Sequence, residues 1–176
     1  MRILIISQYF YPENFKINDI AFFLKSKEFD VTVLTSKPNY PEGKFFKGYN
    51  FFNKNTEIIN GVKIIRVPTI PRLNGGAFGL ILNYFSYLFF SFFSFLFRIK
   101  NKYDLIFAVL LTPATSLLPM IWIKKRFKIP VILWVLDLWP DSFYANTRFR
   151  IDIISKIIEN ISNQVYNNSD SIFISS

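Results

Sequence analysis

The sequence contains no cysteine and no histidine among its 176 residues. Without cysteine, the chain can form no disulfide bond and can carry out no thiol chemistry. Without histidine, it lacks the side chain that most often acts as a general base near neutral pH and most often binds metals. Any catalytic base in this chain is therefore an aspartate or a glutamate, unless another molecule supplies one.

Glycine is also scarce, with six residues, and the common phosphate-binding motifs are absent. The lack of G-x-x-x-x-G-K-[ST] argues against a P-loop nucleotide hydrolase. The lack of G-x-G-x-x-G after the first apolar run argues against a dinucleotide-dependent enzyme. The glycine-rich segment 75–79 precedes a long apolar run, and we interpret it as a helix lead-in, with phosphate binding as the alternative. No clustered metal ligands appear, so we expect no metal.

Hydrophobic residues, by contrast, make up 51% of the chain, and phenylalanine alone occurs 22 times. This composition predicts a folded domain with a substantial core rather than a disordered chain. The formal net charge is +9, which is typical of proteins that meet nucleic acid, an anionic membrane surface or phosphorylated substrates. The apolar run 3–6 is too short for a signal peptide, so we expect the chain to stay on the cytoplasmic side.

The first 36 residues predict a strand, a helix and a second strand. An apolar run at 3–6 is followed by a polar and aromatic loop, by helical periodicity at 15–27 and by a second apolar run at 31–35. Such a βαβ unit is the nucleus of a parallel sheet, and ligands bind beyond the carboxyl ends of its strands. The loop 8–14 is therefore expected at the mouth of a site, beside a helix N-terminus that suits an anion.

The later part of the chain continues this alternation. Asn60-Gly61 separates apolar runs at 56–59 and 62–67, which predicts a β-hairpin. Further strands and helices are predicted in turn at 103–109, 112–127, 130–135, 151–166 and 170–175. The predicted fold class is α/β: a Rossmann-like parallel sheet with helices on both faces, plus a hairpin and one long aromatic helix.

This aromatic helix is predicted over Phe78–Phe97, a stretch of twenty residues without a charge. At helical spacing its small and polar side chains gather in one sector, namely Asn83, Ser86, Tyr87, Ser91 and Ser94. Large apolar side chains lie opposite, namely Phe78, Phe85, Phe89, Phe92 and Leu96. Three interpretations stay open: a buried core helix, a helix in the plane of a membrane, and a membrane span. A basic edge of Arg98, Lys100 and Lys102 would favour anionic headgroups.

Two carboxylates, Asp137 and Asp141, flank Trp139 in a loop predicted at 137–142. Carboxylates beside aromatic rings commonly bind sugar hydroxyls and the apolar faces of sugars. The alternative is that Asp137 caps a turn and Trp139 packs in the core. Asn14 is likewise either the N-cap of the first helix or a ligand contact, and it shares a helix face with Asn18.

Four segments resemble the N-terminal half of family-4 glycosyltransferases, in particular the L-fucosamine transferase branch of O-antigen, capsule and colanic-acid synthesis. They are QYFYPENFKINDIA (8–21), TSKPNYPEGKFFKGY (35–49), NGVKIIRVP (60–68) and LWVLDLWPDS (133–142). The resemblance implies a retaining, metal-independent enzyme of GT-B fold. A nucleotide sugar, expected to be UDP-linked, would serve as the donor substrate. The acceptor would be a polyprenyl-diphosphate-linked sugar at the cytoplasmic face of the inner membrane, with the protein bound peripherally or monotopically.

The same resemblance assigns roles to individual residues. Asp137 would be the catalytic base or would orient the acceptor, because the position of the family's usual histidine is Leu136 here. The family's usual Gly-Gly after the first strand is replaced by Glu13-Asn14. The acceptor would contact Tyr11, Glu13, Asn14, Lys16, Asn18, Lys37, Asn39, Tyr40, Lys44, Trp139 and Asp141, with Lys16, Lys37 and Lys44 near its diphosphate.

The resemblance also bounds the domain organisation. Residues 1–176 would form one acceptor-binding domain, without the C-terminal domain that binds the donor, so the chain would be inactive alone. The expected partners are the lipid-linked acceptor, the inner-membrane surface and a donor-binding domain or chain, but not nucleic acid. An alternative from a different class is a non-catalytic subunit that anchors a separate catalytic chain to the membrane.

Overall fold

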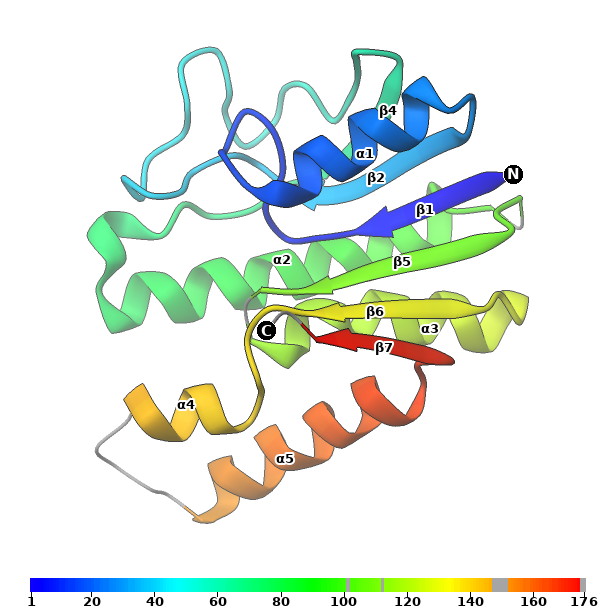
Figure 1. Cartoon of the computed structure of the whole chain (residues 1–176). Coiled ribbons are helices and arrows are strands. Elements are labelled where there is room, and N and C mark those ends of the chain that lie inside the picture. The colour runs from blue at the N-terminus through cyan, green and yellow to red at the C-terminus, as the bar shows by residue number, and fades with distance from the viewer. Residues whose placement is uncertain (101, 112, 147–151, 175–176) are drawn as a thin grey trace.

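The chain folds around a seven-stranded β-sheet in the computed structural model, which describes residues 1–100, 102–111, 113–146 and 152–174 (Figure 1). The strands are β1 (Arg2–Ile6), β2 (Asp30–Ser36), β3 (Thr56–Ile59), β4 (Val62–Val67), β5 (Leu105–Leu110), β6 (Val131–Val135) and β7 (Ser171–Ile174). Their order across the sheet is β3-β4-β2-β1-β5-β6-β7. The predicted alternation of strands and helices is confirmed.

All strand pairs are parallel except β3 with β4. Without the antiparallel edge strand β3, the order is that of a doubly wound sheet, in which the winding reverses between two central strands. Here the reversal lies between β1 and β5, which pair from Ile3 opposite Leu105 to Ile6 opposite Ala108. The fold is therefore α/β with a mixed, mostly parallel sheet, and its expected ligand crevice lies beyond the ends of β1 and β5.

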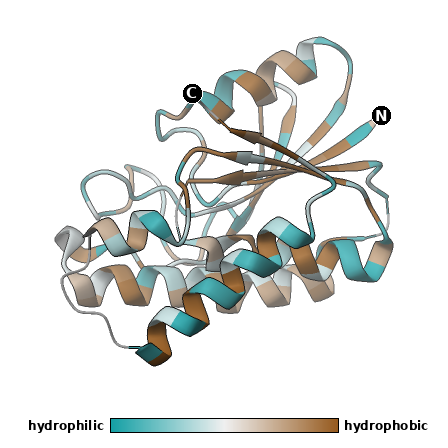
Figure 2. Cartoon of the chain, turned by 60° about the horizontal axis from the view of Figure 1, so that its bottom comes forward, coloured by the Kyte–Doolittle hydropathy of each residue, from teal (hydrophilic) through white to brown (hydrophobic). Residues whose placement is uncertain are grey.

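Helices cover both faces of the sheet. Helix α1 (Lys16–Ser26) packs on one face, where Ile17 and Ala21 meet Ile3 and Ile5. The other face carries α2 (Ala77–Phe97), α3 (Leu118–Phe127) and α5 (Asp152–Asn167). Figure 2 shows the mostly hydrophobic strands of the sheet among these helices. The alternation of side chains along β1 explains both cores, because successive residues of a strand point to opposite faces.

Three short helices complete the described residues: η1 (Leu73–Gly75), η2 (Ala114–Leu117) and α4 (Asp141–Asn146). One of the two interpretations of Asn14 and the end of one predicted loop are wrong here. The N-cap of α1 is Phe15, without a side-chain cap, so Asn14 is not the cap. The predicted loop 137–142 already ends where α4 begins, and Asp141 is the first residue of that helix.

The hairpin prediction is confirmed. Strands β3 and β4 pair from Ile59 opposite Val62, leaving Asn60 and Gly61 as a two-residue turn. Both turn residues have positive φ, 48° and 77°, as the tight turn that suits twisted strands requires. Asparagine and glycine tolerate this backbone conformation best, which is why the dipeptide signals the turn.

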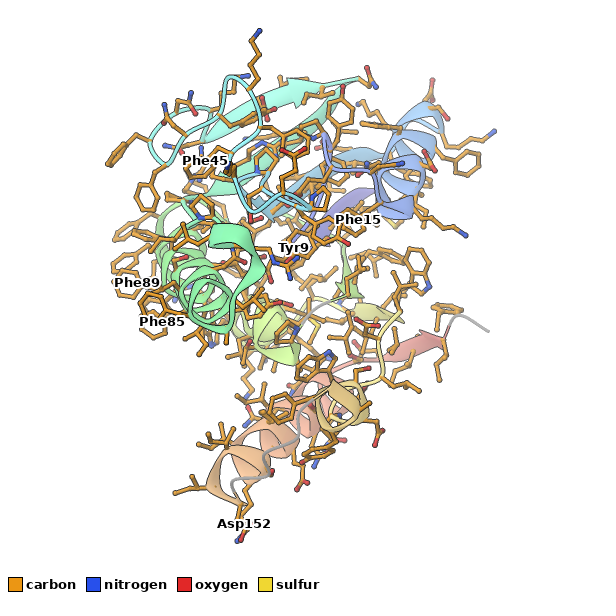
Figure 3. All side chains as sticks on the ribbon, turned by 90° about the vertical axis from the view of Figure 1, so that its left-hand side faces the viewer. Tyr9, Phe15, Phe45, Phe85, Phe89 and Asp152 are labelled. Carbon is orange, nitrogen blue, oxygen red and sulfur yellow. The ribbon has the colours of Figure 1, made fainter. Side chains whose placement is uncertain are left out.

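Helix α2 lies against the sheet with its small and polar side chains inward. Asn83 is fully buried, and its amide donates to the carbonyl of Ile70 at 2.6 Å. The opposite side is exposed, with Phe85 66% and Phe89 48% accessible (Figure 3). The interpretation as a fully buried core helix is therefore wrong. By length and hydropathy α2 is the one helix of the described residues that could cross a membrane.

Candidate functional site

A cleft of about 320 Å³ opens beyond the carboxyl ends of β1 and β5, where the winding of the sheet reverses. Three segments meet there. Tyr9 comes from loop 8–14, which the sequence predicted at the mouth, Tyr40 from the loop that follows β2, and Asp137 and Trp139 from the loop between β6 and α4. The full lining is Tyr9, Phe15, Tyr40, Arg72, Tyr84, Leu111, Pro113, Asp137 and Trp139.

One wall of the cleft is aromatic. The rings of Tyr9 and Phe15 stack with their centroids 5.3 Å apart (Figure 3). The ring of Tyr40 lies 5.5 Å from that of Tyr9 and 5.4 Å from that of Phe15. Three packed rings from two loops and the start of α1 give a rigid apolar surface at little conformational cost. Such a wall suits the face of a sugar ring or an apolar chain.

Glu13 lies beneath this wall and joins the loops that follow β1 and β2. Its carboxylate accepts hydrogen bonds from the backbone N–H groups of Asn39 and Tyr40, both at 2.8 Å, and from Phe10 at 3.3 Å. Only 1% of Glu13 is exposed, and burial raises its pKa to about 7 against the effect of these bonds. The structure thus gives Glu13 a supporting position below the cleft.

Asn18 and Asn39 have similar positions. The Asn18 side chain accepts from Tyr11 N–H at 2.9 Å and donates to the Glu13 carbonyl at 2.7 Å. The side-chain oxygen of buried Asn39 accepts from the backbone N–H of Arg72 at 3.2 Å. Both amides therefore hold the loops in place, and Asn39 fixes the backbone of a residue that lines the cleft.

Arg72 is a cleft residue that the sequence analysis missed. Its guanidinium lies over the ring of Tyr40 at 5.2 Å and over that of Tyr9 at 6.0 Å, close enough for cation–π attraction. Within the described residues, no carboxylate lies within ion-pair distance of Arg72. Gly79 permits this arrangement, because a Cβ there would lie 2.3 Å from the carbonyl oxygen of Arg72.

Asp137 and Trp139 form the wall contributed by the loop after β6. The N–H of Asp137 donates to the carbonyl of Leu110 at 3.1 Å, which holds the exposed Asp137 at the mouth. Trp139 is half-buried; its ring lies 5.9 Å from Phe143, and its carbonyl accepts from the Tyr166 hydroxyl at 2.8 Å. Trp139 thus packs against the core and lines the cleft as well.

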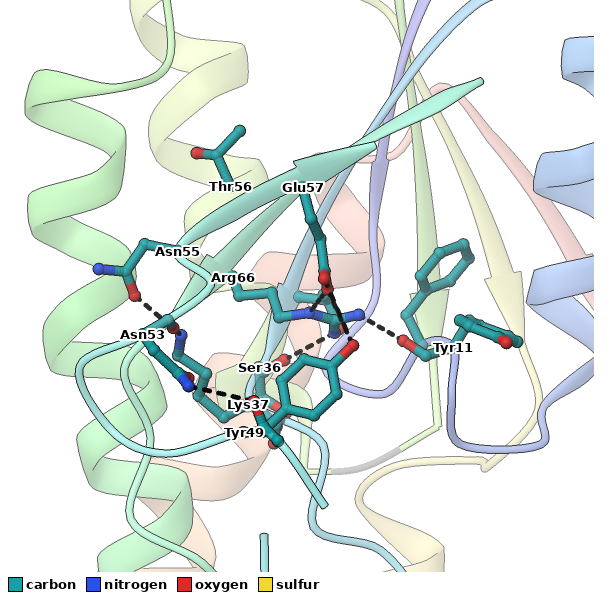
Figure 4. Close-up of polar contacts among 12 residues, drawn as sticks. Tyr11, Ser36, Lys37, Tyr49, Asn53, Asn55, Thr56, Glu57 and Arg66 are labelled. Carbon is teal, nitrogen blue, oxygen red and sulfur yellow. Dashed lines mark hydrogen bonds and ion pairs between the residues drawn. The ribbon is translucent and has the colours of Figure 1, made fainter. Parts of the chain in front are cut away.

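Lys37, expected near an acceptor diphosphate, lies in a different cluster (Figure 4). It is fully buried, and its ammonium donates to the carbonyl of Asn53 and, at 2.8 Å, to the side chain of Asn55. Burial and nearby Arg66 lower the pKa of Lys37 to about 8. Because its hydrogen bonds hold the loop before β3, the structure does not place Lys37 at the cleft.

Five further predicted residues lie outside the cleft lining as far as the chain is described. They are all exposed: Tyr11, Asn14, Lys16, Lys44 and Asp141. Tyr11 packs edge-on against Phe22 at 6.0 Å, and its carbonyl accepts from Arg66 at 2.5 Å. Of the predicted acceptor residues, the structure therefore brings Tyr40 and Trp139 together with Asp137.

An apolar groove of about 490 Å³ adjoins the cleft and shares Tyr84, Pro113 and Trp139 with it. Its other lining residues come from α2, η2, α4 and α5: Ala77, Leu80, Ile81, Ala114, Thr115, Phe143, Ile158 and Ile161. Ile81 also belongs to the exposed side of α2, since 65% of it is accessible. The groove therefore runs from the polar cleft to the exposed aromatic side of α2.

The sequence carried a weak signal for the residues that it missed. Arg72 lies in the segment between the strand that ends at Val67 and the glycines of 75–76, and the carboxyl ends of such strands were expected at the site. Tyr84 occupies the boundary between the polar and aromatic sectors of α2, where a side chain can reach a neighbouring cleft.

No protein-family model matches the chain, and a comparison with curated proteins gives no significant match.

Proposed function

We propose that this chain is the acceptor-binding domain of a retaining glycosyltransferase of GT-B type. It would act on a polyprenyl-diphosphate-linked sugar at the cytoplasmic face of the inner membrane, in bacterial surface-polysaccharide synthesis. The observation that carries the proposal is the apolar groove that opens from an aromatic, polar cleft toward the exposed phenylalanines of α2. The sugar and the charged linker of such a ligand match the cleft, and its hydrocarbon chain matches the groove and the apolar side of α2.

The cleft supplies two features that sugar binding uses. Aromatic rings at Tyr9, Phe15 and Tyr40 suit the apolar face of a sugar. The exposed carboxylate of Asp137 can accept a hydrogen bond from the sugar hydroxyl that attacks the donor, acting as base or orienting group. The nucleotide-sugar donor would be bound by a second domain, in the same polypeptide or in a partner chain.

Helix α2 supports the membrane part of the proposal. Its polar side is buried against the rest of the domain. Its apolar side is exposed along its length at Phe78, Phe85, Phe89, Phe93 and Phe97. Such a helix lies in the interface plane with its apolar side among the acyl chains. Of the basic edge, Arg98 instead binds the carbonyl of Arg66 at 3.1 Å, so Lys100 is the exposed cation.

The function is tested by assaying sugar transfer to a polyprenyl-diphosphate-linked sugar with the chain joined to its donor-binding domain. Asp137→Ala should abolish transfer while leaving the circular-dichroism spectrum and the melting temperature unchanged. Asp19→Ala removes an exposed carboxylate from α1, outside the cleft lining, and should retain activity. Undiminished transfer by Asp137→Ala would rule out the role given to Asp137.

Membrane association is tested separately by co-sedimentation with vesicles that contain anionic lipid. The double variant Phe85→Ser/Phe89→Ser should lose at least about tenfold in binding, since each buried phenylalanine contributes about 1.5–3 kcal/mol. Phe23→Ser is the matched control, because Phe23 is an exposed phenylalanine on α1, and this variant should bind normally. Alkaline carbonate should release the protein from membranes; retention would indicate a span through α2 instead.

The second candidate, a non-catalytic anchoring subunit, is favoured by exposed apolar side chains elsewhere. Ile153 and Ile157 of α5 and Phe173 and Ile174 of β7 are all more than half exposed. A catalytic partner could bury this surface. A separate catalytic chain could co-purify with this protein and stay fully active with its Asp137→Ala variant. That result would support the anchoring subunit over the glycosyltransferase domain.

A further inference from the structure

Three donor atoms of the cleft are buried without a hydrogen bond of normal geometry in the described residues. They are the Nε of Arg72, the Nε1 of Trp139 and the hydroxyl of Tyr9, the last of which has a polar neighbour in the hydroxyl of Tyr84. The donors come from three different loops, and all three residues line the same cleft. An unmet buried donor costs about as much as a lost hydrogen bond, so a convergent set of three points to an acceptor-rich ligand.

The charge of the cleft indicates which kind of acceptor. Arg72 is the only cationic residue in the described lining, and it stacks on Tyr40 rather than pairing with a carboxylate. Burial raises the pKa of Tyr9 well above its usual range, so its hydroxyl stays protonated and can donate. A guanidinium fork with two neutral donors matches the geometry and charge of phosphate oxygens. The carboxylate of Asp137, in the same lining, would repel a phosphate and can instead accept a hydrogen bond from an uncharged hydroxyl group.

We propose that Arg72, Trp139 and Tyr9 form a diphosphate-binding subsite, and that the diphosphate belongs to a lipid whose chain occupies the adjoining apolar groove. The subsite rests on the proposed function for its place in sugar transfer, but its existence can be tested without any transfer. It replaces Lys37 as the phosphate contact, because Lys37 is bonded to the loop before β3.

The groove favours a lipid over a nucleotide as the source of the diphosphate. It is continuous with the subsite at Trp139, and its far side is built from aliphatic side chains such as Leu80, Ile158 and Ile161. Thr115 and the phenol of Tyr84 are its only hydroxyl-bearing residues in the described lining. A base and a ribose need several polar partners, whereas an isoprenoid chain needs apolar contact alone.

The first test measures binding of inorganic pyrophosphate to the full 176-residue chain by isothermal titration calorimetry. Arg72→Gln should weaken binding by about tenfold or more, because it removes a charge-assisted hydrogen bond. Arg126→Gln is the matched control. It removes one exposed positive charge from α3, so its net charge equals that of Arg72→Gln. Trp139→Phe and Tyr9→Phe should each cost a few-fold. Equal losses for Arg72→Gln and Arg126→Gln would overturn the subsite.

The second test identifies the source of the diphosphate with farnesyl diphosphate and UDP as probes. Farnesyl diphosphate should bind at least about tenfold more tightly than pyrophosphate, since its chain buries apolar surface in the groove. Ile158→Asn should remove this advantage without changing the affinity for pyrophosphate. A higher affinity for UDP than for farnesyl diphosphate would overturn the lipid assignment.

These binding results separate the subsite from the function. Arg72-dependent binding of farnesyl diphosphate together with failed sugar transfer would sustain the subsite and reject the glycosyltransferase. Normal transfer by Arg72→Gln, with unchanged affinity for the lipid diphosphate, would reject the subsite and leave the glycosyltransferase standing.

Discussion

Two arginines that lie six residues apart have opposite surroundings. Arg66, in β4, is fully buried, and its guanidinium is bonded to Glu57, Ser36 and Tyr11. Arg72 lines a cleft, and its Nε has no partner. Figure 4 shows the closed network of Arg66. The guanidinium of Arg66 is paired within the fold, whereas that of Arg72 is available to a ligand. The sequence alone does not distinguish these two roles.

The largest effect expected from this comparison concerns Glu57. Glu57→Gln leaves the charge of Arg66 buried without its counterion, so the free energy of unfolding should fall by about 3–5 kcal/mol. Arg72→Gln removes cation–π contacts and an interaction with the Tyr84 hydroxyl, but no ion pair, and should cost about 1 kcal/mol. Urea denaturation followed by circular dichroism measures both. Comparable losses at the two sites would break the distinction between the arginines.

Glu13 is a second buried ionisable residue whose side chain is hydrogen-bonded within the fold, and its contribution to stability depends on pH. Because the folded-state pKa is raised from 4.5 to about 7, the folded chain binds more protons than the unfolded chain between these values. Stability should therefore decrease as pH rises from about 4.5 to 7, by roughly 3 kcal/mol in total. Thermal melts between pH 4.5 and 8 measure the slope.

Glu13→Gln should flatten this pH profile. The variant has no ionisable group at the site, but it should lose about 1–3 kcal/mol at pH 5, because its amide cannot accept from Phe10 N–H. Near pH 8 the variant and the natural chain should be nearly equal. An unchanged slope in the variant would show that another group titrates in this range.

The close approach of Gly79 to Arg72 offers a third, smaller effect. Gly79→Ala places a Cβ against the carbonyl oxygen of Arg72, so the start of α2 and the loop must separate. We expect a loss of about 1–3 kcal/mol in stability, as for overpacked cores. Pyrophosphate affinity should fall as well, since Arg72 moves. Gly76→Ala, which meets no atom within 4 Å, is the control and should change neither.

The smallest effect is expected at Trp139. Trp139→Phe keeps an aromatic ring against Phe143 but removes the unpartnered indole N–H. Stability should change by less than about 0.5 kcal/mol, because removal of an unmet buried donor offsets the apolar contact that the smaller ring loses. Equilibrium unfolding in urea checks this value. A larger loss would mean that the indole N–H serves the fold rather than a ligand.

Local patterns were sufficient to predict most of the fold. The βαβ unit followed from apolar runs, the hairpin from Asn60-Gly61, and the two sides of α2 from helical spacing. Each of these signals acts within a few residues of the chain, where periodicity and backbone preferences decide the structure.

The site was predicted only in part, because its details depend on contacts between distant residues. The loops at the mouth were placed by the parallel topology, which brings strand ends to one edge. Whether a polar side chain points into the cleft or beneath it was not encoded locally. Apart from its local bond with Phe10, Glu13 finds its partners Asn39 and Tyr40 at separations of 26 and 27 residues along the chain. Lys37 finds Asn53 and Asn55 at separations of 16 and 18 residues.

Helix α2 has a consequence for how a substrate would reach the protein. In the proposed arrangement its exposed side rests in the membrane surface over about 30 Å, and the groove opens beside it at Ile81. A lipid-linked substrate could then enter by lateral diffusion, without its hydrocarbon chain crossing water. The rate of encounter would depend on the number of substrate molecules per area of membrane rather than on their concentration in the cell volume.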